Sequence, residues 1–163
     1  MNKVRNILIA VCVGVVFMVS YMIISALIKP PQKAIDFGYH TVGGTVSRLY
    51  TEARDDGAVL IFIDPELEGS NKILESVIKH AGDIPVIAVS VKDENSAHLA
   101  MLPESARNLE NLVLDGQEIE KLYNVTDRAP ITYFINNEFY VTQAFVGSIK
   151  EKTIESCIQK LKE

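Results

Sequence analysis

The sequence has few cysteines and no cluster of basic residues, and each absence narrows what the chain can be. Proteins that bind nucleic acid through its phosphates carry a basic patch, whereas this chain of 163 residues has a formal net charge of -5. We therefore expect no nucleic-acid partner. Two cysteines are too few for a disulfide framework, and a chain of this size can bury a hydrophobic core without one.

Charge is also absent from one long stretch near the N-terminus. Residues Ile7 to Ile28, ILIAVCVGVVFMVSYMIISALI, carry no charged side chain over about twenty residues, the length of a helix that crosses a bilayer. Pro30 and Pro31 follow the stretch. The sequence predicts a membrane anchor in residues 1–32, with one span at about 7–28, and a separate domain in residues 33–163.

The charges that flank this span predict its orientation. Lys3 and Arg5 precede it, and basic residues before a span favour a cytoplasmic N-terminus. We expect a single-pass protein of the cell membrane, of bacterial type, whose domain lies outside the cytoplasm. A cleaved signal peptide is the alternative, but Ile24 and Ala26 around Ser25 form a poor cleavage site.

The two cysteines lie in different settings. Cys12 falls inside the predicted span, whereas Cys157 lies in KEKTIESCIQKLKE, on the apolar face of a predicted helix. We expect Cys157 to be buried. A cysteine in lipid and another in a soluble core cannot form a disulfide.

The pattern of the remaining residues predicts an α/β domain. AVLIFI and IPVIAVSV are typical of strands buried on both faces, and ITYFI and FYVTQAFVG of an antiparallel hairpin. SNKILESVIKHA predicts an amphipathic helix, with Ser70 or Asn71 as its N-cap and Gly82 as its C-cap. TVSRLYTEAR is a candidate short helix capped by Thr45. Strands that alternate with helices and end in a hairpin and a closing helix indicate parallel strands with an antiparallel edge.

The stretch FIDPELEGSNK carries a family resemblance, together with the C-terminal half LVLDGQEIEKLYNVTDRAPITYFINNEFYVTQAFVG. From Lys33 onward the chain resembles the membrane-anchored thiol-disulfide oxidoreductases of the TlpA/ResA type, which are relatives of thioredoxin. The resemblance implies a thioredoxin-like sandwich, in which a central mixed sheet is flanked by helices. It places Leu67, Glu68, Gly69 and Ser70 where the family has Cys-x-x-Cys. It also places Ala129 and Pro130 where the family has its cis-proline, a loop that holds substrate protein in relatives.

The departure from the family pattern decides what chemistry we expect. Dithiol exchange needs one thiolate to attack and a second thiol to resolve the mixed disulfide. Leu67 cannot attack, and the hydroxyl of Ser70 does not ionise near neutral pH. We therefore expect no catalytic residue and no cofactor, and we interpret Leu67–Ser70 as a degenerate active-site position.

Two functions remain open at this stage. The first is a tethered, non-catalytic binding, assembly or chaperone-like module for an envelope protein, with Ala129 and Pro130 in the partner-binding loop. The second is a redox protein that works through Cys157 or through the thiols of a partner. The missing cysteine pair favours the first.

A metal site is not expected. Asp64, Glu66 and Glu68 loosely fit the spacing of a calcium loop, but a strand rather than a helix precedes them and Pro65 stiffens the turn. The three histidines show no metal-ligand spacing.

Overall fold

The computed structural model describes residues 32–91, 96–114, 116–125 and 130–163. Residues Lys33–Glu163 form one compact unit. Except for Gln32, the predicted anchor lies outside the described residues, so its helix stays a prediction. Among the described helices, none is both long and apolar enough to cross a membrane.

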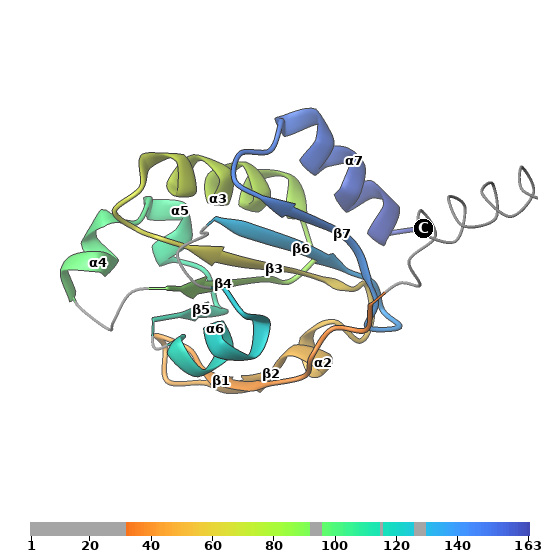
Figure 1. Ribbon diagram of the computed structural model, residues 1–163, viewed down its shortest axis with the longest axis horizontal. Coiled ribbons are helices and arrows are strands. Elements are labelled where there is room, and N and C mark those ends of the chain that lie inside the picture. The colour runs from red at the N-terminus through yellow and green to blue at the C-terminus, as the bar shows by residue number, and fades with distance from the viewer. Residues whose placement is uncertain (1–31, 92–95, 115, 126–129) are drawn as a thin grey trace, which may run out of the picture. The chain divides into compact units, whose positions relative to one another are not determined.

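A five-stranded mixed sheet lies at the centre of this unit (Figure 1). Its order is β5-β4-β3-β6-β7, with the bounds β3 Ala58–Ile63, β4 Val86–Ser90, β5 Leu112–Val113, β6 Ile131–Ile135 and β7 Val141–Val146. Strand β4 pairs in parallel with β3 and β5, whereas β6 runs antiparallel to both β3 and β7. The prediction of parallel strands with a hairpin at one edge is confirmed.

The central strand β3 shows why the sheet is covered on both faces. All six of its residues are buried. Because successive side chains of a strand point to opposite faces, Val59, Ile61 and Ile63 enter one core, and Leu60 and Phe62 enter the other. Burial on both faces explains why AVLIFI is an uninterrupted apolar run.

Helices complete the two cores. One face of the sheet packs against α3 (Glu68–Ala81), α5 (Glu104–Arg107) and α7 (Glu151–Leu161). The other face packs against α2 (Leu49–Glu52), α6 (Gln117–Tyr123) and a two-stranded sheet of β1 (Gly38–His40) and β2 (Val46–Arg48). In Figure 1, α3 and α7 lie above the sheet, and α6 and α2 lie below it. The short helix α4 (Ser96–Met101) lies at the end where α3 begins.

Two local predictions are wrong. The predicted helix in TVSRLYTEAR is a strand over Val46–Arg48 followed by one helical turn, because pairing with β1 overrides helix propensity there. Thr45 is not a helix cap; it lies in the turn that closes this hairpin, and its N–H donates to the Thr41 hydroxyl at 3.1 Å. Helix α3 begins at Glu68 with Leu67 as N-cap, before either predicted cap.

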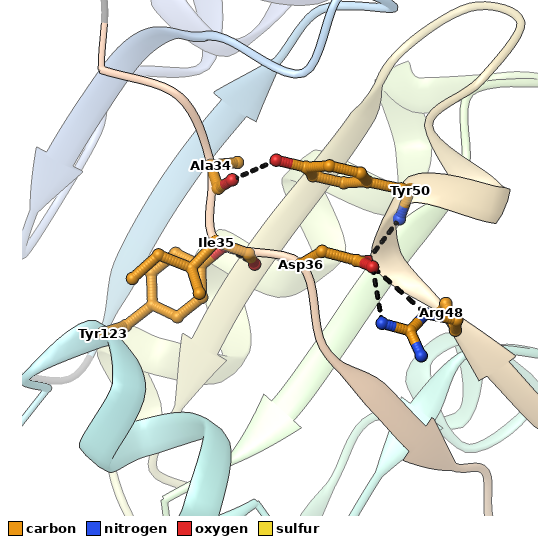
Figure 2. Close-up of polar contacts among 6 residues, drawn as sticks. All are labelled: Ala34, Ile35, Asp36, Arg48, Tyr50 and Tyr123. Atoms are coloured by element: carbon orange, nitrogen blue, oxygen red, sulfur yellow. Dashed lines mark hydrogen bonds and ion pairs between the residues drawn. The ribbon is translucent and has the colours of Figure 1, made fainter.

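A segment that we name the strap, Lys33–Phe37, leads into the domain and is fastened by hydrogen bonds (Figure 2). The Tyr50 hydroxyl donates to the Ala34 carbonyl at 2.5 Å, and the Tyr123 hydroxyl donates to the Ile35 carbonyl at 2.8 Å. Burial raises the pKa of Tyr123, so its phenol stays protonated and remains a donor at neutral pH. The strap is therefore held to α2 and α6 by its backbone.

Asp36 adds a second set of contacts to the strap. Its carboxylate accepts hydrogen bonds from the Tyr50 N–H at 3.1 Å and from Arg48 Nη2 at 2.7 Å (Figure 2). The ring of Tyr50 stacks on Phe139 with centroids 4.0 Å apart, and the Lys33 ammonium lies over both rings. These contacts join the strap to the β6–β7 turn.

Candidate functional site

The segment between β3 and α3, Asp64–Ser70, is the site that the sequence singled out, and we name it the corner. Asp64 organises its turn: its carbonyl accepts the Leu67 N–H at 3.1 Å, and its carboxylate accepts the Glu66 N–H at 3.0 Å. A carboxylate that bonds the backbone two residues on stabilises a turn locally. These bonds within the segment help to set the direction in which Leu67 leaves the sheet.

Ser70 has a structural part in this corner. Its side chain is fully buried, and its hydroxyl accepts a hydrogen bond from the Asp64 N–H at 3.1 Å. The bond ties the first turn of α3 back to the end of β3. A buried hydroxyl already bonded to the backbone stabilises the turn.

Leu67 is placed in the opposite way. As N-cap of α3 it has an extended backbone and no capping side-chain hydrogen bond, and 47% of its surface is exposed. It belongs to neither hydrophobic core. Its carbonyl accepts the N–H groups of Ser70 and Asn71, so the residue is held firmly while its side chain meets solvent.

The other two corner residues are open to solvent. Glu68 pairs with Lys72 one turn later at 2.6 Å, and this hydrogen bond lowers the pKa of Glu68 and raises that of Lys72. Both side chains are largely exposed, so the pair adds little stability. A Cβ atom on Gly69 would meet no atom within 4 Å beyond its chain neighbours and the backbone of its own helix, so there is open space beside this residue.

Pro130 lies at the start of the strand beside the corner. The first residue of β6, Ile131, pairs with Phe62 of β3, so the Pro130 end of β6 lies next to the strand that feeds the corner. Pro130 is buried, and its carbonyl accepts the Gly147 N–H at 2.8 Å. Gly147 has a φ of +81°, which explains why a glycine follows β7. Ala129 lies outside the described residues.

Helix α4 forms a wall of the corner that the sequence analysis missed. The Asn71 amide donates to the Pro65 carbonyl at 3.1 Å and to the Met101 carbonyl at 3.2 Å, which holds the end of α4 against the corner. His98 of α4 also lies 3.4 Å from the Glu66 carboxylate. The signal available was an amide in the first turn of α3, which we had interpreted only as a possible cap.

A cavity of about 460 Å³ runs from the corner along α3. Its lining residues come from α3, from the segment between β7 and α7 and from the first residue of α7: Gly69, Lys72, Ile73, Glu75, Ser76, Lys79, Ser148, Ile149 and Glu151. Lys72 and Lys79 each pair with a carboxylate, so the positive charges of these two lysines in the cavity wall are balanced.

Cys157 lacks the open surroundings of an active-site thiol. It lies on the core-facing side of α7 with 7% of its surface exposed, as predicted, and it forms no disulfide. Burial raises the pKa of the thiol, and Lys160 opposes this only in part. A raised pKa and a covered sulfur both reduce the supply of thiolate.

The carboxylates of the corner do not gather into a metal site. Among the described residues, no group of three or more His, Cys, Asp or Glu side chains could hold a metal ion. Glu66 and Glu68 point to different partners, His98 and Lys72.

No family model and no curated protein matches the chain. Solved structures do match. A thiol:disulfide interchange protein of the thioredoxin family from Chlorobium tepidum superposes with a TM-score of 0.69 at 12% identity, over 83% of this chain and 99% of that one. The fold is thioredoxin-like.

Other thioredoxin-like structures agree. A thio-disulfide isomerase from Thermus thermophilus gives a TM-score of 0.62 at 17% identity, over 82% of this chain and 97% of that one. An exposed lipoprotein thioredoxin from Streptococcus pneumoniae gives 0.57 at 18% identity, over 77% and 99%. The expected sandwich of a mixed sheet between helices is confirmed. At such identities the likeness establishes the fold alone, and function must be argued from the site.

Proposed function

We propose that this chain is a non-catalytic, membrane-tethered binding module outside the cytoplasm, which holds a partner protein at its corner. The observation that carries the proposal is the pair of residues at the two ends of Leu67–Ser70. One is an exposed leucine and the other is a buried serine bonded to the backbone. Neither can supply a thiolate.

The chemistry of the remaining sulfur supports the same proposal. Thiol-disulfide exchange proceeds through attack by an accessible thiolate. Cys157 is buried in the α7 core, its pKa is raised, and it is distant in sequence from the corner. A redox function through Cys157 would require this covered sulfur to become accessible first.

The extracytoplasmic part of the proposal rests on the uncharged N-terminal stretch and on the pneumococcal neighbour, whose description is an exposed lipoprotein. A partner in that compartment would meet a turn closed by hydrogen bonds and an exposed Leu67 side chain. An exposed apolar side chain on a rigid turn is suited to packing against an extended segment of another protein.

The redox part is tested by insulin reduction with the full-length chain in mild detergent. We expect no turnover above that of free dithiothreitol alone. Robust turnover that is lost in Cys157→Ser would overturn the proposal in favour of a redox enzyme.

The binding part is tested by photo-crosslinking in cells that express the chain natively. A benzoylphenylalanine at position 67 should give a discrete adduct. The matched control is the same group at position 46, where an exposed valine of β2 lies under the opposite face of the sheet.

Leu67→Asp should weaken capture of the adduct partner without unfolding the chain, and Glu66→Gln with Glu68→Gln should matter less. Equal crosslinking from both positions, or none from position 67, contradicts a binding role for the corner.

A further inference from the structure

The outer edge of β7 is open along most of its length. β7 is the last strand in the order β5-β4-β3-β6-β7, and β6 is its only strand partner among the described residues (Figure 1). The strap reaches this edge at one point, where Lys33 bridges Tyr140. From Thr142 to Val146, no segment that the structure describes pairs with the outer edge.

The register of the β6–β7 pair shows which backbone groups this edge offers. The Gly147 N–H donates to the Pro130 carbonyl at 2.8 Å, so these two residues form a hydrogen-bonded pair. Hydrogen-bonded and non-hydrogen-bonded pairs alternate along an antiparallel ladder. Ala144 and Val146 therefore direct their N–H and C=O groups away from β6, where a further strand could bind them.

This edge lacks the features that keep strand edges apart. The run Phe139–Ile149, FYVTQAFVGSI, contains no charged residue and no proline. The one register shift, between Phe134 and Ile135, lies toward the strap end, so Gln143–Val146 pairs regularly with β6. Natural proteins protect exposed edges with charged side chains, prolines or bulges. An edge without them along its open part is available for pairing.

The sequence of the edge is compatible with pairing to itself. In an antiparallel pair centred on Ala144, Val146 lies opposite Thr142 of the second copy. Phe145 lies opposite Gln143 in the same register. No charges oppose each other within the ladder, and β-branched and aromatic residues favour such cross-strand pairs.

The charged residues that bound the run suit the same arrangement. Glu138 precedes the run and Lys150 follows it. Because the start of one antiparallel strand lies beside the end of the other, each end of the pair holds Glu138 from one copy and Lys150 from the other. Lys33, at that end, already lies over the rings of Tyr50 and Phe139. Such self-complementarity is what a two-fold contact between identical chains requires.

We propose that β7 pairs antiparallel with β7 of a second copy of this chain, about a two-fold axis at Ala144. The pairing joins two five-stranded sheets into one continuous sheet. The contact is small, so it is weak in dilute solution and is favoured when the predicted anchor confines both copies to one membrane. This interface is separate from the corner and goes beyond the proposed binding function.

Disulfide trapping in membranes of cells that express the full-length chain tests the register. In a chain that carries Cys12→Ala, Ala144→Cys should give a disulfide-linked dimer under mild oxidation. Opposite residues of a hydrogen-bonded pair have Cα atoms about 5.5 Å apart, which a disulfide can span. The matched control is Val46→Cys, at an exposed position of the other sheet, and it should stay monomeric. Mass spectrometry of the product identifies the second chain.

Edge variants test the pairing without a crosslink. Sedimentation equilibrium of the full-length chain in mild detergent measures the dissociation constant of the dimer. Ala144→Pro should raise it at least about tenfold, since each copy loses an outward N–H donor. Proline is tolerated where a strand N–H faces outward, so circular dichroism should show an intact fold.

A charged edge gives an independent variant. Val146→Lys should also weaken the dimer, because a lysine at an exposed edge opposes strand addition. Val46→Lys is its matched control, since both valines are 66% exposed, and it should leave the dissociation constant unchanged.

Four results would overturn the inference. The first is a chain that stays monomeric and forms no disulfide from position 144, and the second is equal disulfide formation from position 46. The third is a dissociation constant that neither edge variant changes, which would place the contact elsewhere. The fourth is a product at position 144 that contains a different protein. Loss of crosslinking at position 67 would overturn only the binding role of the corner.

Discussion

The strap and the corner are both segments at the domain surface, but they are held in place in opposite ways. The strap is bound by side chains from elsewhere in the fold: two tyrosine hydroxyls reach its carbonyls, and its Phe37 is 5% exposed. In the corner, hydrogen bonds among nearby residues, including Asp64 and Ser70, close the turn, which presents Leu67 to solvent. Loss of the exposed Leu67 side chain should therefore leave the domain folded, whereas loss of the buried Phe37 side chain should destabilise it.

Substitution of Phe37 gives the strongest test of this comparison. Its ring lies 5.8 Å from that of Tyr39 and 5.9 Å from that of Tyr123. We expect Phe37→Ala to lower the free energy of unfolding by about 3–5 kcal/mol, because a large buried aromatic leaves a cavity. Urea unfolding followed by circular dichroism measures it. Leu67→Ala is the control and should stay within about 0.5 kcal/mol of the parent chain. Similar losses at both positions would remove the distinction.

Asp36 gives a smaller effect that separates two kinds of contact. Asp36→Ala should cost about 1–2 kcal/mol, since it leaves the Tyr50 N–H without its acceptor and Arg48 without its carboxylate. Asp36→Asn keeps an acceptor for the N–H and loses only the charge opposite Arg48, whose side chain is 61% exposed. The asparagine variant should therefore retain most of the stability in the same urea assay. A loss as large as that of alanine would make the ion pair the main contact.

The far end of α3 offers a pH test. Glu151 at the start of α7 accepts hydrogen bonds from Lys79 at 2.7 Å and from His80 at 2.9 Å, and these lower its pKa to about 2. A carboxyl whose folded pKa lies below its unfolded pKa stabilises the fold above about pH 4.5, and this contribution is lost as the pH falls toward 2. The decline in stability from pH 5 to pH 3 should be shallower in Glu151→Gln, as measured by urea unfolding at each pH. Parallel declines would mean that the bridge is absent in solution.

Leu67→Asp should have the smallest effect on stability. An exposed side chain outside both cores leaves little to lose, so the thermal midpoint should move by no more than about 2 °C. Scanning calorimetry or thermal circular dichroism checks this. A large drop would place Leu67 in the core and end its interpretation as a docking residue.

The same contrast explains which parts of the structure could be predicted from the sequence. Local patterns were enough for β3, for α3 and α7 and for the β6–β7 hairpin, because apolar periodicity reports which face is buried. The burial of Cys157 followed from that periodicity. The start of α3 could not be predicted from periodicity. Its N-cap is a leucine without a capping side-chain hydrogen bond, and the turn is closed by Asp64 and Ser70.

The contacts that build the strap and the α4 wall could not be predicted. Tyr123 and Ile35 are 88 residues apart in the sequence, and Asn71 and Met101 are 30 apart. No local pattern marks a tyrosine as the donor to a distant carbonyl. The positions Leu67–Ser70 came from a resemblance to a family, and the geometry then gave Leu67 and Ser70 their different surroundings.

Because Cys157 is buried, its rate of labelling reports how often the surrounding core opens. Because only 7% of the Cys157 surface is exposed, a thiol reagent reaches this sulfur when the core around α7 opens locally, and the labelling rate at low reagent follows the population of that open form. Mass spectrometry of the modified peptide distinguishes Cys157 from Cys12. Labelling over hours rather than seconds would show that the core around α7 opens rarely.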